Sequence, residues 1–213
     1  IRSMLDGAYR YSSQAGQDFV VDSALKQKRD GVFLDVGGYD GVTGSNTFFL
    51  EVFRGWKGAL IEPVRAQMKK AEEVRRCPCL GVAVAAKEGE ADFIEVTEGY
   101  TQMSGLADSY DDKILETVRG NARHKERSFR VETRTLARII EDQKLGTPDF
   151  ISLDIEGGEL AVLEAFPFDR YPVGIWAIEN NTADAAIPAL MKSHGYELME
   201  FCGPDEIYRR LIN

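Results

Sequence analysis

The chain is poor in the residues that build disulfide frameworks and metal centres. Its 213 residues include three cysteines, Cys77, Cys79 and Cys202, and two histidines. The cysteine number is odd, and the pair Cys77-Pro78-Cys79 has no second pair to complete a zinc site. We therefore expect the cysteines to be reduced thiols. A single domain of this length can fold without a disulfide or a structural metal ion.

Long apolar runs and an excess of basic residues are also absent. No stretch of about 18 apolar residues occurs and no basic, then apolar, segment opens the chain, so a membrane span and a signal peptide both lack support. The formal net charge of −9 argues against nucleic acid or an anionic membrane as the main partner. We expect a small-molecule substrate and, by default, a cytoplasmic location, and we leave a homodimer open. Because the chain begins with Ile1 rather than Met, a piece of a longer protein is equally compatible.

What the sequence does contain is a regular alternation of buried strands and amphipathic helices. Apolar strands are predicted at 32–36, 59–62, 79–84, 150–154 and 173–179, with alternating, more exposed strands at 91–97, 129–133, 196–201 and 206–211. This order predicts one α/β domain with a mainly parallel, doubly wound, Rossmann-like sheet and an antiparallel edge. We expect a helical lead-in over 1–30 and an insertion or lid over 90–134.

Acidic residues and glycines collect where the predicted parallel strands end, which is where such sheets bind ligands. Asp35 lies in the first strand, before the loop Gly37-Gly38-Tyr39-Asp40-Gly41, and Glu62 closes the second. A carboxylate at the end of the second strand can accept both hydroxyls of a ribose. Glu62 is therefore predicted to bind the ribose of a nucleoside cofactor.

The glycine loop distinguishes between nucleoside cofactors. It lacks the Gly spacing of the dinucleotide fingerprint, and no Gly-Lys-Ser/Thr phosphate loop occurs. Asp40 would repel a pyrophosphate but attract a cation. S-adenosylmethionine fits this charge: its ammonium would suit Asp35 or Asp40, and its carboxylate could face the helix start near Ser45 and Asn46.

Five motifs give the chain a resemblance to a known family. They are SQAGQD at 13–18, FLDVGGYDG at 33–41, SNT at 45–47, GWKG at 55–58 leading to Ile-Glu-Pro at 61–63, and DIEGGE at 154–159. In this order they resemble the FkbM-type methyltransferases over nearly the whole chain. The resemblance implies a class I Rossmann-like fold, S-adenosylmethionine as methyl donor, and O-methylation of a hydroxyl on a sugar or other small natural product.

The predicted donor site draws on the glycine loop, the helix start and the resemblance. It comprises Gln14, Gln17, Asp35, Gly37, Gly38, Asp40, Ser45, Asn46, Glu62, Pro63 and Ala83. Two other functions are kept open: an enzyme with an NAD-type nucleotide cofactor, and a non-catalytic interaction domain with the S-adenosylmethionine fold. The glycine spacing disfavours the first, and the intact loop and Glu62 disfavour the second.

A hydroxyl acceptor must lose its proton, and two strand-end acids are predicted to take it. Asp154 and Glu156 are the base candidates, since mutual repulsion of neighbouring carboxylates raises a pKa toward neutrality. The alternative for this pair is a structural turn. A second hypothesis uses Asp154, Glu179 and Asn180 as hard oxygen ligands for Mg²⁺. Residues 100–104 are candidates to line the cleft, and His124 is expected at the surface.

Overall fold

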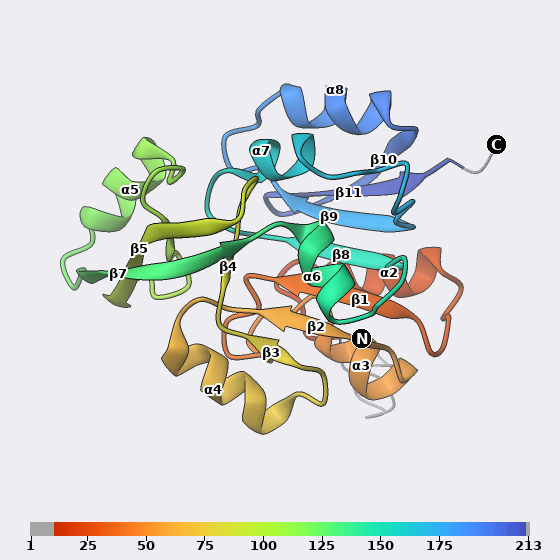
Figure 1. Cartoon of the computed structure of the whole chain (residues 1–213), viewed down its shortest axis with the longest axis horizontal. Helices are drawn as coiled ribbons and strands as arrows, with labels where there is room; N and C mark the ends of the chain where they lie inside the picture. Colours follow the sequence, from red (N-terminus) through yellow and green to blue (C-terminus); the bar gives the residue numbers. More distant parts are fainter. Residues whose placement is uncertain (1–10, 212–213) are drawn as a thin grey trace.

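The computed structural model describes residues 11–211, so the first ten residues of the predicted lead-in lie outside the described part. Figure 1 shows a broad layered body with a second, smaller sheet projecting from one side. Within residues 11–211, no helix is both long enough and apolar enough to cross a membrane.

A seven-stranded mixed sheet forms the centre of the body. Its strands, in spatial order, are β10 (Tyr196–Cys202), β11 (Asp205–Arg210), β9 (Ile175–Glu179), β8 (Phe150–Leu153), β1 (Val32–Val36), β2 (Lys57–Ile61) and β3 (Cys79–Leu80). The five strands from β9 to β3 run parallel, whereas β11 pairs antiparallel with both of its neighbours, β9 and β10. The prediction of a mainly parallel sheet with an antiparallel edge is confirmed.

Helices cover both faces of this sheet, as its buried strands require. On one face, α2 (Gln17–Ala24) and α3 (Phe48–Arg54) pack on a core that includes Phe33 and Phe150. On the other, α6 (Leu136–Asp142), α7 (Glu159–Glu164) and α8 (Ala186–Ser193) cover a larger core around Trp176. The charged helix α4 (Arg65–Val74) flanks β3. Since both faces are filled, ligand space is left at the carboxyl ends of the strands.

A second sheet departs from the prediction for residues 79–84. We predicted one strand there, but the chain breaks after β3, and β4 (Ala83–Val84) instead pairs with β7 (Lys125–Arg134). The sheet order is β4-β7-β5-β6, where β5 is Gly89–Glu98 and β6 is Gly105–Leu106. The single predicted strand therefore serves two sheets and joins the smaller one to the body.

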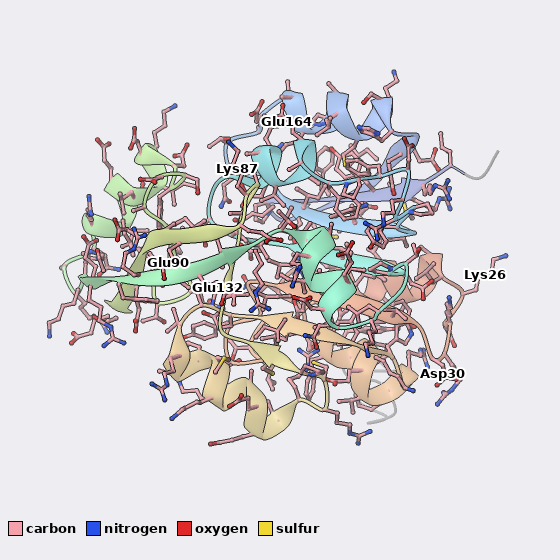
Figure 2. The ribbon with its side chains drawn as sticks, in the orientation of Figure 1. Lys26, Asp30, Lys87, Glu90, Glu132 and Glu164 are labelled. Carbon is pink, nitrogen blue, oxygen red and sulfur yellow. The ribbon has the colours of Figure 1, made fainter. Side chains whose placement is uncertain are left out.

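The segment 90–134, predicted as an insertion, consists of most of this sheet and a helix that we did not predict, α5 (Asp112–Arg119). Glu90 and Glu132, labelled in Figure 2, are register partners on β5 and β7, and both are exposed. The opposite side of the sheet carries buried Phe93 and Val131. The face of Glu90 and Glu132 is solvated at that end of the sheet, but it carries buried Ile94 and Val96 further along β5, so each face is covered in part.

Candidate functional site

A cavity of about 590 Å³ opens at the carboxyl ends of the central parallel strands. Its lining draws on residues 14–17 at the start of α2, the loop after β1, the ends of β2, β8 and β9, β4 with part of β5, the loop between β5 and β6, and the turn before β11. Segments far apart in the sequence therefore meet at one rim. This volume suits a cofactor together with a small substrate.

Glu62 lies at the rim just after β2, where it is buried. Its Oε2 accepts a hydrogen bond from the Tyr39 backbone N–H at 3.0 Å, and its Oε1 accepts one from the Val64 N–H at 2.7 Å. Burial raises the pKa of Glu62 to about 7, although the two N–H donors oppose that rise. The carboxylate is thus fixed in direction, and its remaining lone pairs can accept hydroxyl groups.

The first glycine of the loop is required by close packing rather than by a ligand. Gly37 has φ +81°, and a Cβ at this position would lie 1.9 Å from the Asp154 carbonyl oxygen. At Gly38 a Cβ would lie 2.4 Å from the Leu60 side chain. The glycines therefore bring the ends of β1, β2 and β8 together, and Gly37 and Gly38 both line the cavity.

Asp35 lines the cavity but is already paired with a cation that sequence reasoning missed. Arg75, at the end of α4, places a fully buried guanidinium 3.2 Å from Asp35 Oδ2. The same guanidinium is ion-paired with Glu51 and donates to Thr47 Oγ1 at 2.7 Å. Because Asp35 already has Arg75 as its cationic partner, the predicted ammonium contact at Asp35 loses much of its electrostatic basis.

Asp40 does not line the cavity, contrary to the prediction. Its carboxylate accepts hydrogen bonds from the Val42 and Thr43 backbone N–H groups at 3.0 and 2.7 Å, and from Thr43 Oγ1 at 2.7 Å. These bonds lower the pKa of Asp40 although burial opposes them. Asp40 therefore closes a local turn, as Asp often does in loops.

The other predicted donor-site residues do line the cavity. They are Gln14, Gln17, Ser45, Asn46, Pro63 and Ala83. Ser45 Oγ donates to Asp35 and accepts from the Thr47 and Phe48 N–H groups, so it caps α3 as well. Asn46 Nδ2 donates to Ser152 Oγ at 2.9 Å, while Asn46 Oδ1 is buried with no hydrogen-bond partner within residues 11–211.

Three carboxylates meet beyond β8 and β9. Asp154, Glu156 and Glu179 each offer an oxygen within 4.8 Å of the others. Burial and then the neighbouring acids raise the pKa of Glu156 to about 9 and that of Glu179 to about 8, and burial followed by the charge of Glu179 raises the pKa of Asp154. Glu156 also has a left-handed backbone, with φ +60°. Strain and repelling charges at one point are typical of functional sites.

The predicted metal set is not assembled, because Asn180 points elsewhere. Its Nδ2 donates to Glu206 Oε1 at 3.0 Å, its Oδ1 accepts from the Asp184 N–H at 2.8 Å, and it does not line the cavity. Glu156 takes its place beside Asp154 and Glu179. Three carboxylate oxygens remain suitable ligands for a hard cation, so the structure changes the membership of the hypothetical site.

The loop between β5 and β6 forms one wall of the cavity. Tyr100, Thr101, Gln102, Met103 and Ser104 all line it, and Tyr39 Oη lies 2.9 Å from Thr101 Oγ1. This hydrogen bond joins the wall to the glycine loop. His124 lies outside the lining, with its Nε2 at 2.9 Å from Glu126 Oε2.

Asp205, at the start of β11, is a further cavity residue that we did not predict. It is buried, and its Oδ2 accepts from Gln17 Nε2 at 3.0 Å and from Asn46 Nδ2 at 3.4 Å. Burial raises its pKa, although these two donors oppose the shift. A turn at Gly203-Pro204 was the available sequence signal, and it does not indicate a site by itself.

Comparison with known proteins agrees with this geometry. The model of the methyltransferase FkbM domain matches residues 35–198. The chain belongs to the FkbM methyltransferase family. A search among the curated proteins found no match.

A solved structure of an FkbM methyltransferase supports the fold of the family. The FkbM methyltransferase from Methylobacillus flagellatus KT has a TM-score of 0.55 at 15% identity, over 93% of this chain and 48% of that protein. This chain therefore spans about half the length of that relative. A TehB-like S-adenosylmethionine-dependent methyltransferase from Corynebacterium glutamicum has a TM-score of 0.46 at 10% identity, over 93% of this chain and 89% of that one. The class I Rossmann-like fold predicted from the sequence is confirmed.

Proposed function

We propose that this chain is an S-adenosylmethionine-dependent O-methyltransferase acting on a hydroxyl of a sugar or other small natural product. The observation that carries the proposal is the lining of the cavity in a chain of the FkbM family. Six acidic residues contribute to that lining, and it contains no lysine, arginine or histidine among residues 11–211. Such a cavity favours a cationic cofactor over a pyrophosphate.

The residues present fit the methyl donor. Glu62 would accept the ribose hydroxyls, and the apolar patch of Val64, Ala83, Phe93 and Leu106 begins two residues away and would contact the base. Gln14 and Gln17 would help to hold the amino-acid end. No phosphate site is needed.

Methyl transfer demands alignment and exclusion of water more than bond activation. S-adenosylmethionine supplies a methyl group on a sulfonium whose leaving group is a neutral thioether. The protein aligns the acceptor oxygen with that group, and the walls formed by 99–104 and the glycine loop keep water out. The remaining task is removal of the acceptor's proton.

Asp154 and Glu156 would take that proton. Both line the cavity, and Glu156 Oε2 is buried without a partner within residues 11–211. The raised pKa values make these carboxyls stronger bases when ionised, and a positive charge bound nearby favours the ionised form. We therefore expect Glu156→Gln or Asp154→Asn to lower kcat by about 10²–10⁴-fold with little change in donor affinity.

The control is Glu164→Gln, since Glu164 is an exposed acid on α7, labelled in Figure 2. Equal kcat values for Glu156→Gln and Glu164→Gln would contradict the role of Glu156. Activity in EDTA tests the magnesium hypothesis separately: full activity in EDTA, with no gain on adding Mg²⁺, would remove it.

Calorimetry with S-adenosylmethionine, S-adenosylhomocysteine and NAD tests the proposed function. We expect the methyl donor and its product to bind at one site and NAD not to bind. Binding of NAD alone would favour the alternative of an NAD-type enzyme. Binding of the donor with no transfer to any hydroxyl compound would favour a non-catalytic domain.

A further inference from the structure

The cavity holds more acidic groups than the methyl donor accounts for. Of its six acidic residues, Asp35 is paired with Arg75, and Glu62 is directed at a ribose in the proposed function, on which this inference rests. The acids that remain are Asp154, Glu156, Glu179 and Asp205. The donor brings a single net positive charge. A wall of four carboxyl groups, whose ionised form a bound cation favours, is therefore left for the acceptor to face.

This wall is continuous across the ends of three strands. Asp205 and Glu179 are register partners on β11 and β9, and Glu179 offers an oxygen within 4.8 Å of those of Asp154 and Glu156 beyond β8. Asp205 is held in place by Gln17 and Asn46, which bond to its Oδ2. The acids thus form an extended surface rather than a single point.

Two buried acceptors on the same surface independently indicate a missing hydrogen-bond donor. Glu156 is 7% exposed and Asn46 is 8% exposed, and Glu156 Oε2 and Asn46 Oδ1 have no partner within residues 11–211. Buried polar atoms without a partner are rare in folded proteins unless a ligand or water supplies one. Asn46 is uncharged, so this observation does not follow from the clustering of acids.

We propose that the acceptor carries a protonated amine beside the hydroxyl that is methylated, as an amino sugar does, and that Glu179 and Asp205 hold this ammonium group while the hydroxyl faces Asp154 and Glu156. An ammonium group has three donors and no acceptor, which matches a wall made of acceptors. Phosphate and carboxylate compounds are repelled by this wall wherever its carboxyl groups are ionised.

A divalent metal ion is the competing occupant of this surface. A metal gathers its ligands around one point, and Asp154, Glu156 and Glu179 alone would do so. It would leave Asp205 and Asn46 Oδ1 without a role. An organic cation with several hydrogen-bond donors uses the whole width of the wall, which is why the structure favours it.

The test uses three probes of equal size on the full chain saturated with S-adenosylhomocysteine: ethanolamine, ethylene glycol and glycolate. Saturable binding is followed by ligand-observed nuclear magnetic resonance at physiological salt. We expect ethanolamine to bind about tenfold more tightly than ethylene glycol, the effect of one charge-assisted contact, and glycolate not to bind. Equal binding of ethanolamine and ethylene glycol, or no binding of ethanolamine, overturns the proposal.

Variants locate the bound amine. Asp205→Asn keeps an oxygen that can accept from Gln17 and Asn46 but removes the charge, so ethanolamine should bind about tenfold more weakly. Glu200→Gln removes an equal charge from an exposed position on the neighbouring strand β10 and should change nothing. Equal weakening in both variants means only non-specific attraction to an acidic protein and overturns the proposal.

Two further results separate this proposal from the proposed function. If methyl transfer requires Mg²⁺ and Mg²⁺ displaces ethanolamine, the cation of this surface is a metal and the acceptor proposal is wrong. If S-adenosylhomocysteine itself does not bind, the proposed function fails and the acceptor proposal falls with it. If it binds and a neutral sugar is methylated as efficiently as its amino counterpart, the acceptor proposal alone is wrong.

Discussion

Replacing Arg75 by methionine removes the buried cation that links α3, β1 and the glycine loop beside the donor site. Its guanidinium is buried between α3, β1 and the glycine loop, where it pairs with Asp35 and Glu51. It also donates to the Gly41 carbonyl at 3.2 Å. Methionine fills similar space but leaves two buried carboxylates without their counterion.

The expected cost follows from that loss of pairing. Breaking a buried ion pair by removing one partner costs about 3–5 kcal/mol, because the other charge stays buried. Asp35 retains bonds from Ser45 Oγ and Thr47 Oγ1, and Glu51 retains bonds from the Arg76 and Cys77 N–H groups. We therefore expect Arg75→Met to lose about 3 kcal/mol of unfolding free energy, the lower end of that range, which a domain of typical stability survives.

Urea unfolding followed by tryptophan fluorescence measures this quantity, since Trp56 and Trp176 are both buried. The matched control is Arg76→Met, one residue further along and exposed, which should lie within about 0.5 kcal/mol of the wild type. A double-mutant cycle with Glu51→Gln should return about 1–3 kcal/mol, because the second change removes one orphaned charge.

The reasoning is refuted if Arg75→Met is as stable as Arg76→Met. A coupling free energy of zero between Arg75→Met and Glu51→Gln would also refute it, since the two charges would then not interact. Affinity for S-adenosylhomocysteine should fall along with stability, because Arg75 fixes the loop that carries the donor site.

Three other expectations concern the loop around the donor. The affinity for S-adenosylhomocysteine should fall about tenfold from about pH 8 to pH 6, because Glu62 has a pKa of about 7 and its ionised form accepts the ribose hydroxyls. In calorimetry, Glu62→Gln should abolish this dependence of the affinity on pH. Gly37→Ala should cost at least about 2 kcal/mol in urea unfolding, because it adds a left-handed alanine and a clash with the Asp154 carbonyl. Tyr39→Phe removes the hydrogen bond to Thr101, so the free energy of opening loop 99–104, measured by amide hydrogen exchange, should fall by about 0.5–1.5 kcal/mol. Thr101→Val should give the same result. Unchanged exchange in either variant would show that this bond does not hold the loop against the glycine loop.

The central sheet could be predicted because its strands are apolar on both faces. Residues 150–153 are all buried, and three of the four are apolar, which between turn signals favours a buried strand. The second sheet could not be predicted in the same way. β4 and β6 contain two residues each, which is too short for any periodic pattern.

Helix α5 shows a different kind of failure, since a signal was present. Asp111 caps the helix by accepting from the Lys113 and Ile114 N–H groups, and Ile114 and Val118 have the four-residue spacing of one helix face. No element was predicted for residues 113–119, which lie between a polar stretch and a charged one. A cap followed by that spacing should have outweighed the composition.

Some acidic residues of the site have a cationic side chain or backbone N–H groups as partners within the fold, and others do not. The sequence alone does not show which acids belong to each group. Asp35 and Asp40 were predicted to bind a cation, but the first pairs with Arg75 and the second accepts hydrogen bonds from turn N–H groups. Arg75 belongs to a charged helix that reads as solvent-facing, and only the packing of α4 buries its guanidinium. Asp154, Glu156, Glu179 and Asp205 have no ion pair with a basic side chain in the described part of the chain. A carboxylate binds a cationic ligand only where the fold has left it without a cation of its own, so the acids least explained by folding are those that we assign to the acceptor.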